Sequence, residues 1–370
     1  MRIGIITLPL SAAGTEPLHD MIRLLVPLTD RLSILTGGDA YKSLKNESNL
    51  RVEEVTHLGS SLASSRVIRH IVTQLRITVR MLTKQSDVGH WVFFIGGDGL
   101  VIPLMASRLT GRRTILILAG SVSLTQRAYK DQFEELSRLT TALSCALSNR
   151  IVLYSPRLKS EWQLERYSSK ITIANHHFPD YVMFSIRKHL VDRKSTIGYV
   201  GRLSEEKGVM NLIRAAPRLM SSRPDIELII AGDGPCREAI LELLHRLGLE
   251  KRVRVLGWMP HDQLPGLLNE LGLIVMPSST EGLPNLMLEA MGCGTPVLAT
   301  PVGAIPDVIE DGRTGFLMET NSPECILRNI LRAIDSPRLQ EVSRNARELA
   351  ISRFNFQKSL LEWKAIMGDK

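Results

Sequence analysis

The chain has 370 residues, 44% of them hydrophobic and 23% charged, which fits two globular domains and excludes a disordered protein. Its four cysteines are too few and too scattered for a disulfide scaffold, and no pair has zinc-site spacing. Lys and Arg outnumber Asp and Glu by 24 to 15 in residues 1–190, but number 22 against 23 in the remainder. This imbalance predicts either an anionic partner for the first half, nucleic acid or a membrane surface, or a generic basic surface.

Short aliphatic runs alternate with helical patterns in the first half, which predicts parallel strands joined by helices. The first run, IGIITL, follows a single Arg and is too short for a signal peptide, so we interpret it as a strand. Without an export signal, the expected location is the cytoplasm. No apolar stretch reaches the length of a membrane-spanning helix. Further strands are expected at RLSILT, RVEEVT, HWVFFIG, TILILA, RIVLYS and KITIAN.

Residues 64–84 form the most informative helical pattern of this half. At 100° per residue, five basic side chains fall within one arc: Arg66, Arg69, Arg76, Arg80 and Lys84. Ile68, Ile71, Val72, Leu75, Val79 and Leu82 occupy the opposite side. Ile77 and Met81 flank the basic arc, where we expect them to be exposed. Such a stripe suits an anionic membrane surface, and a solvated face of an ordinary core helix explains it equally well.

The second half has strand-like runs at TIGYVG, IELIIAG, RVRVLG, GLIVMPS and PVLAT, again separated by helical patterns. About a dozen strands are too many for one ordinary open sheet, so the predicted fold class is α/β with two doubly wound, Rossmann-like domains. The charged segment 184–195 is the expected linker. We therefore predict domains at 1–188 and 189–354, with a final helix at 355–370 packing back onto the first.

Two loops of the second half combine glycine with charge. After the run TIGYV, Arg202 and Lys207 lie between Gly201 and a predicted helix, an arrangement that suits a diphosphate but also fits two solvated charges. After IELIIA, Gly232 and Gly234 half-match a dinucleotide fingerprint, whose third glycine is replaced by Arg. A tight turn explains that pair equally well.

The strongest segment is MPSSTEGLPNLMLEAMGCGTPVLAT, residues 276–300. It predicts a strand, a loop that Glu281 closes, a helix beginning near Pro284 and containing Glu289, and a further strand. Helix-start amides attract anions, whereas carboxylates accept hydrogen bonds from hydroxyls. A ligand with both phosphates and hydroxyls, such as a nucleotide sugar, fits this combination.

These residues resemble the family-four retaining glycosyltransferases of GT-B fold, also called glycosyl transferases group 1. The resemblance is strong over residues 195–320 and weak over ANHHFPDYVMF and the segment VGAIPDVIEDGRTGFL, where Ala304 and Asp307 replace the usual Gly and Glu. It implies two Rossmann-like domains facing across a cleft. It also implies a nucleotide-sugar donor in the second domain, an acceptor mainly in the first, and no metal or other cofactor.

The resemblance assigns roles to individual residues. Arg202 and Lys207 would neutralise the diphosphate, Glu281 would bind donor-sugar hydroxyls, and Glu289 would bind the ribose. Backbone amides of Gly282, Leu283, Pro284 and Asn285, as one helix-start segment, would contact the sugar and the β-phosphate. The base would lie near Gly232, Gly234, Leu256 and Gly257.

The first half departs from the family at two places. The usual Gly-Gly loop after the first strand is reduced to Gly14, and the usual His after the fifth strand is replaced near Gly120 and Ser121, which could contact the sugar instead. His176 and His177 follow a strand without further metal ligands in reach, so a packing role is expected.

The predicted function is therefore transfer of a sugar to a glycan or lipid-linked acceptor, with retention of configuration, by an enzyme peripheral to the inner face of a cell membrane. A sugar-nucleotide epimerase and a non-catalytic sugar-nucleotide binder remain the alternatives. Nucleic acid is not expected as a partner, because the 18 aromatic residues suggest no stacking platform.

Overall fold

The computed structural model describes residues 1–56, 63–120 and 133–368, and the side chains of residues 12–13 and 63–66 lie outside this description. The described residues form two compact units. Unit 1 contains the residues up to 178 together with 356–368, and unit 2 contains residues 179–355. The division thus lies ten residues before the predicted boundary at 188.

Unit 1 is built on a seven-stranded parallel sheet of order β3-β2-β1-β4-β5-β6-β7 in the described residues. Each aliphatic run of the first half supplies one strand, because a parallel sheet covered on both faces needs apolar residues on both. The strands are β1 (Arg2–Ile6), β2 (Arg31–Thr36), β3 (Leu50–Glu54), β4 (His90–Phe93), β5 (Arg113–Ile117), β6 (Arg150–Leu153) and β7 (Ile171–Ile173).

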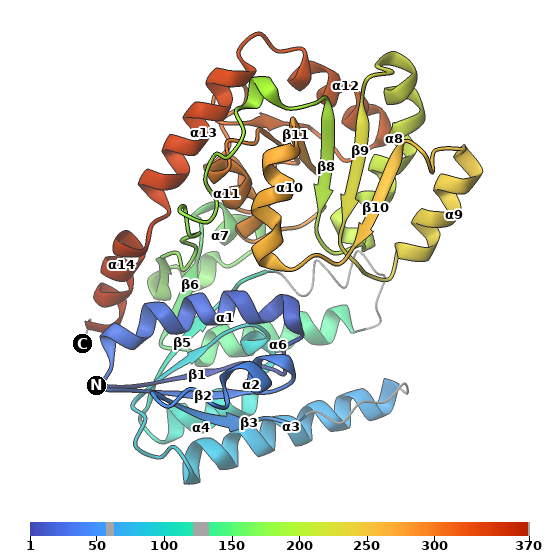
Figure 1. Cartoon of the computed structure of the whole chain (residues 1–370). Helices are drawn as coiled ribbons and strands as arrows, with labels where there is room; N and C mark the ends of the chain where they lie inside the picture. The colour runs from blue at the N-terminus through green and yellow to red at the C-terminus, as the bar shows by residue number, and fades with distance from the viewer. Residues whose placement is uncertain (57–62, 121–132, 369–370) are drawn as a thin grey trace. The chain divides into compact units, whose positions relative to one another are not determined.

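The helices of unit 1 divide between the two faces of its sheet. The chain adds β2 and β3 on one side of β1, and then returns to add β4 to β7 on the other side. Right-handed crossovers therefore put α1 and α2 on one face of the sheet and α3, α4 and α6 on the other. The helices are α1 (Ala12–Leu25), α2 (Asp39–Leu44), α3 (Ala63–Thr83), α4 (Val101–Leu109), α6 (Glu134–Leu147), α7 (Arg157–Glu161) and α14 (Phe356–Gly368) (Figure 1).

The last helix, α14, belongs to unit 1 although the chain of unit 2 separates it from the rest. It packs against α1. The Trp363 indole N–H donates to the Asn175 carbonyl at 3.0 Å, and the Asn175 N–H donates to Glu362 Oε2 at 3.0 Å. These bonds attach α14 to the segment that follows β7.

Unit 2 holds a six-stranded parallel sheet of order β10-β9-β8-β11-β12-β13. Its strands are β8 (Thr196–Val200), β9 (Glu227–Ala231), β10 (Val253–Gly257), β11 (Leu273–Met276), β12 (Val297–Ala299) and β13 (Phe316–Leu317). Its helices are α8 (Val209–Ser222), α9 (Arg237–Leu247), α10 (Leu264–Glu270), α11 (Asn285–Gly292), α12 (Pro323–Ile334) and α13 (Leu339–Arg353).

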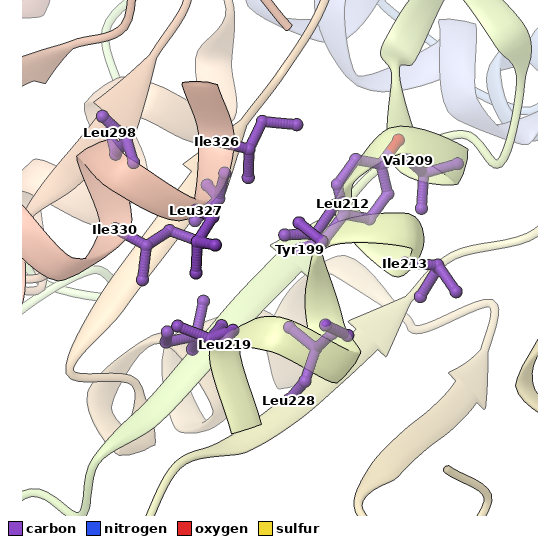
Figure 2. Packing of buried hydrophobic residues seen from close by; sticks show 14 of the residues in the cluster. Tyr199, Val209, Leu212, Ile213, Leu219, Leu228, Leu298, Ile326, Leu327 and Ile330 are labelled. Carbon is purple, nitrogen blue, oxygen red and sulfur yellow. The ribbon is translucent and has the colours of Figure 1, made fainter. Parts of the chain in front are cut away.

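The core of unit 2 lies where α8 and α12 cover the sheet. Leu212 and Leu219 of α8, Ile330 of α12 and the strand residues Tyr199 and Leu228 belong to one buried cluster, which Figure 2 shows. All five are at most 3% exposed. Fully burying an aliphatic side chain of this size contributes about 1.5–3 kcal/mol, so this layer supplies much of the stability that fixes the strand ends.

The predicted α/β class with two doubly wound domains is confirmed. Twelve strands coincide with the predicted runs, and the two-residue strand β13 was not predicted, because two residues carry no periodicity. No described helix is both long enough and apolar enough to cross a bilayer.

The predicted faces of α3 are wrong. Ile77 and Met81, expected to be exposed beside the basic arc, are fully buried. The side expected to oppose the basic arc is instead open to solvent, with Ile68 62% and Val79 58% exposed. Lys84 follows the helix and is exposed, whereas Arg69, Arg76 and Arg80 are half-buried. The side chain of Arg66 lies outside the description.

Candidate functional site

The predicted donor residues gather in unit 2 at the carboxyl ends of neighbouring parallel strands. In such sheets ligands bind beyond these ends, where the loops after adjacent strands meet. The loops after β8 and β11 carry the charged residues. These two loops lie side by side because β8 and β11 are hydrogen-bonded neighbours. The loops after β9 and β10 lie alongside, on the other side of β8.

The loops after β8 and β11 are joined by backbone contacts. The Ser279 N–H donates to the Glu206 carbonyl at 2.7 Å, and the Ser279 hydroxyl donates to the same oxygen at 3.1 Å. Gly208 has φ +69°, and a Cβ there would lie 2.0 Å from the Pro277 carbonyl oxygen. Only glycine therefore permits the close approach that brings residue 207 to the β11 loop.

Lys207 and Glu281 form an ion pair at this junction. Lys207 Nζ donates to Glu281 Oε1 at 2.7 Å, and the Ser278 hydroxyl donates to the same oxygen at 2.7 Å. The Glu281 side chain is 9% exposed and that of Lys207 is 29% exposed. The structure thus brings together a residue predicted for the diphosphate and one predicted for the sugar.

Arg202 lies in the same β8 loop and is exposed. A hydrogen bond fixes its backbone, because the Tyr199 hydroxyl donates to the Arg202 carbonyl at 2.6 Å. Burial raises the pKa of Tyr199, so this phenol remains a neutral donor at physiological pH. Arg202 is therefore an exposed side chain on a fixed backbone, in the same loop as Lys207.

The helix α11 begins four residues after Glu281. Pro284 is its N-cap residue and Asn285 its first helical residue, so the prediction that Pro284 opens the helix is wrong by one position. Gly282 and Leu283 are buried, and the Gly282 carbonyl accepts from the Ala304 N–H at 2.8 Å, which packs the β12 loop on this turn. Asn285 Oδ1 is buried without a hydrogen-bond partner among the described residues. A helix start with an unsatisfied polar atom is suited to holding a polar ligand.

Glu289 lies one turn further along α11 and contacts a residue that the sequence did not point to. His261 Nε2 lies 2.8 Å from Glu289 Oε1, and the Glu289 side chain is only 7% exposed. The Phe184 ring packs 5.2 Å from the imidazole. The one signal for His261 in the sequence is its position just after the strand RVRVLG, because residues that follow strand ends often contact ligands.

The loops after β9 and β10 supply backbone contacts, and the β9 loop also carries the exposed carboxylate of Asp233, which accepts from the Gly234 N–H at 2.8 Å. A Cβ at Gly232 would lie 1.8 Å from the Gly201 carbonyl oxygen, and the Gly232 N–H donates to the Gly257 carbonyl at 2.7 Å. The tight-turn interpretation of the Gly232–Gly234 pair thus has a structural basis. Leu256 is 38% exposed at the end of β10, beside this turn.

In unit 1 the acceptor-side candidates lie in different settings from those expected. Gly14 belongs to the first turn of α1 rather than to a loop, because the helix begins at Ala12. Gly120 is exposed after β5. Ser121 lies outside the described residues.

His176 and His177 are buried at the end of β7, against Tyr154 and Phe94. Their rings lie 4.1 Å apart, and burial lowers the pKa of His176 to about 3 and that of His177 well below its usual range. They serve as neutral core residues, as expected. The described residues contain no cluster of three or more His, Cys, Asp or Glu that could hold a metal ion.

Comparison with known proteins shows which families and structures this chain is similar to. Residues 184–349 match the model of the family described as "Glycosyl transferases group 1". The chain is 32% identical to alpha-D-kanosaminyltransferase of Streptomyces kanamyceticus over 54% of this chain and 53% of that protein. It is 27% identical to 2-deoxystreptamine N-acetyl-D-glucosaminyltransferase of Niallia circulans over 70% of this chain and 71% of that protein. The chain thus spans about half the length of the first of these relatives.

Solved structures show the same fold over the whole chain. HepE of Anabaena in complex with UDP-glucose superposes with a TM-score of 0.80, covering 99% of this chain and all of that chain at 19% identity. Sucrose-phosphate synthase of Thermosynechococcus elongatus superposes with a TM-score of 0.79, covering 99% of this chain and 98% of that one at 15% identity. The predicted GT-B fold class is confirmed.

Proposed function

We propose, on the premise that residues 184–349 belong to the glycosyl transferases group 1 family, that this protein transfers a sugar from a nucleotide-sugar donor to an acceptor with retention of configuration. The observation that carries the proposal is the ion pair between Lys207 and Glu281 beside the start of α11. The pair brings a cation and a carboxylate together, and a helix start follows Glu281 in the chain. These are the groups that a sugar diphosphate requires.

The donor would lie across the strand ends of unit 2. Arg202 and Lys207 would bind the diphosphate, together with the backbone amides between Gly282 and Asn285. Glu281 would accept hydrogen bonds from hydroxyls of the transferred sugar, and Glu289 would accept them from the ribose diol. The base would lie at the turn formed by Gly232 and Gly257, where backbone groups are presented.

Lys207 would contact both the diphosphate and the carboxylate that binds the transferred sugar. Its ammonium group donates to Glu281 Oε1, and an ammonium has three N–H groups to donate. It can therefore keep Glu281 in place and still donate to a phosphate oxygen. The Ser278 hydroxyl donates to the same oxygen, so Glu281 would be oriented before the donor arrives.

The chemical step would depend on stabilising the departing diphosphate. Negative charge accumulates on it as the glycosidic bond breaks, and preorganised cations and amides stabilise such charge most effectively where water is excluded. We propose a front-face substitution in which the departing phosphate accepts the proton of the acceptor hydroxyl. Arg202 and Lys207 would supply the positive charge, so the proposal includes no metal and no other cofactor.

The relatives suggest the chemical class of the donor. HepE is described in complex with UDP-glucose, and curated relatives are named for transferring kanosaminyl and N-acetyl-D-glucosaminyl groups. A nucleoside diphosphate hexose or amino sugar is therefore the donor that we propose. For the acceptor we propose a lipid-linked or membrane-associated glycan, since unit 1 carries the basic excess of the chain, and we propose the cytoplasmic face of a membrane as the place of action.

Incubating the purified protein with a panel of nucleotide sugars tests this function. We expect nucleoside diphosphate to be released from one donor, faster when an acceptor is added. Conversion to an altered nucleotide sugar without release would favour an epimerase. Donor binding with neither product would favour a non-catalytic binder.

A further inference from the structure

The longest helix of unit 1, α3, presents an apolar stripe to solvent. Ile68, Ile71, Leu75, Val79 and Leu82 recur every three or four residues and therefore lie on one face. They are between 36% and 62% exposed. The opposite face already supplies the buried contacts, through Ile77 and Met81. Core packing therefore does not account for the exposed stripe.

The apolar surface continues onto the neighbouring helices of the same sheet face. The helix α4 contacts both α3 and α6, and α3 and α4 run next to each other in Figure 1. On α4, Met105 is 47% and Leu109 80% exposed. On α6, Leu136, Leu139 and Leu143 are between 43% and 57% exposed. Exposed apolar side chains gathered on three adjacent helices mark an interaction surface rather than scattered surface hydrophobes.

The charges on the α3 and α4 parts of this surface are basic, whereas α6 carries the exposed Glu135, which pairs with Arg138 of the same helix. Neither α3 nor α4 contains Asp or Glu, whereas α3 contains four Arg, α4 contains Arg108, and Lys84 directly follows α3. Arg76 and Arg80 are half-buried along one side of the α3 stripe. The Arg76 guanidinium donates to the Thr56 hydroxyl at 3.2 Å, which holds its stem beside β3. The acidic Glu134 and Glu135 lie in the first turn of α6, outside these two helices.

We propose that the face formed by α3, α4 and α6 inserts into the interfacial region of an anionic lipid bilayer. The apolar side chains would enter the boundary between headgroups and acyl chains, and the basic side chains would contact lipid phosphates. A second copy of the chain fits less well, because a symmetric contact through this face would bring the two basic rows together. The inference deepens the proposed function, since a lipid-linked acceptor requires the protein at the bilayer, but the contact itself involves no donor residue.

Insertion and electrostatic attachment predict different responses to salt. A purely basic surface releases from the membrane as salt rises, because the attraction is screened. An inserted apolar face keeps part of its affinity, because burial of apolar area is not screened. We therefore expect binding to anionic vesicles to weaken but to persist at high salt.

Co-sedimentation of the full chain with vesicles tests the proposal. The vesicles are phosphatidylcholine with and without phosphatidylglycerol, each at low and high salt. The double variant Leu75→Asp/Val79→Asp changes two exposed positions and should leave the fold intact, which circular dichroism checks. We expect it to reduce partitioning into phosphatidylglycerol vesicles by at least about tenfold at both salt concentrations. Leu361→Asp is the matched control, because Leu361 is 67% exposed on α14, away from this face, and should bind as the wild type does.

Three results would overturn the proposal. The first is no vesicle binding by the wild type at low salt, and the second is equal binding by the double variant. The third is a wild-type protein that binds no vesicles and sediments as a dimer, while the double variant sediments as a monomer. That result would assign the face to contact with a second copy of the chain. Donor turnover measured without vesicles separates this inference from the proposed function: the function fails if the wild type releases no nucleoside diphosphate, whatever the vesicles show.

Discussion

Lys207 and Glu281 lie 74 residues apart in the chain, yet their side chains meet at 2.7 Å across the ends of two neighbouring strands. The contact depends on the close approach of Gly208 to Pro277, which brings the start of α8 against the β11 loop. One cation and one carboxylate are thereby held at a fixed separation before any ligand binds. Preorganisation of this kind lowers the cost of binding a charged ligand.

Removing the two cations should slow the reaction more than it weakens donor binding. Charge-assisted hydrogen bonds contribute about 1.5–3 kcal/mol. If Arg202 and Lys207 act mainly on the departing diphosphate, Arg202→Ala and Lys207→Ala should each lower turnover by roughly ten- to a hundredfold. Steady-state kinetics measures this, with Arg218→Ala, an exposed arginine on α8, as the control. Unchanged turnover in both variants would remove the diphosphate assignment.

The close approach at residue 208 can be tested with a matched pair of glycines. Gly208 and Gly248 have similar backbone conformations, φ +69° and +65°, but a Cβ at Gly248 would meet no atom within 4 Å. Gly208→Ala and Gly248→Ala therefore share the conformational cost, about 1 kcal/mol, and differ in the clash with Pro277 and the close contact with Asn321 Nδ2 that a Cβ at position 208 would make. We expect Gly208→Ala to lose more stability in urea unfolding and also to lose donor affinity. Equal effects of the two variants would show that the close approach does not hold the site.

His261 is proposed as a positioning residue for Glu289. It touches the carboxylate at 2.8 Å, so His261→Phe should weaken nucleoside diphosphate binding only while Glu289 is present. A double-mutant cycle with Glu289→Gln measures the coupling, which we expect at about 0.5–3 kcal/mol. His261→Asn, which keeps a hydrogen-bonding side chain, should recover part of the loss. Additive effects would assign His261 to packing alone.

The buried histidines predict how the stability of unit 1 depends on pH. Burial lowers the pKa of His176 to about 3 and that of His177 in the same direction, whereas an unfolded histidine titrates near 6.5. Below about pH 6.5 the unfolded chain therefore binds more protons, and stability falls as pH falls. The slope is about 1.4 kcal/mol per pH unit for each histidine, so the two cost about 3 kcal/mol between pH 7.5 and 5.5.

Urea unfolding at these two pH values, followed by hydrogen exchange in β6 and β7, measures the loss. The double variant His176→Leu/His177→Leu should show a much smaller difference between pH 7.5 and 5.5. A difference as large as in the wild type would place its origin in other groups.

The sequence predicted the parts of the fold and of the site that have local patterns. The alternation of aliphatic runs with helical segments identified twelve strands, and the loop–helix pattern around Glu281 and Glu289 identified the start of α11 to within one residue. Both predictions rest on short-range patterns of residue types, which can be identified in the amino-acid sequence directly.

The remaining features depend on tertiary packing. Nothing near His261 marks it as the partner of Glu289, because the contact joins segments 28 residues apart. The helix α3 has apolar residues on two arcs, and periodicity alone does not say which arc meets the sheet. The buried arc includes the polar Thr73 and Gln74, and Gln74 Oε1 accepts from the Ile102 N–H at 2.9 Å, which makes its burial acceptable.

Calorimetric titration with a bare nucleoside diphosphate tests the central claim, that the strand ends of unit 2 form a nucleotide-sugar site, most directly. UDP is the first probe, because the structurally similar HepE is described with UDP-glucose. We expect the wild type to bind UDP. Glu289→Ala should weaken this binding by roughly tenfold or more through loss of the ribose contact, and Glu281→Ala should leave it nearly unchanged. Equal losses in both variants, or no binding of any nucleoside diphosphate by the wild type, would contradict the central claim.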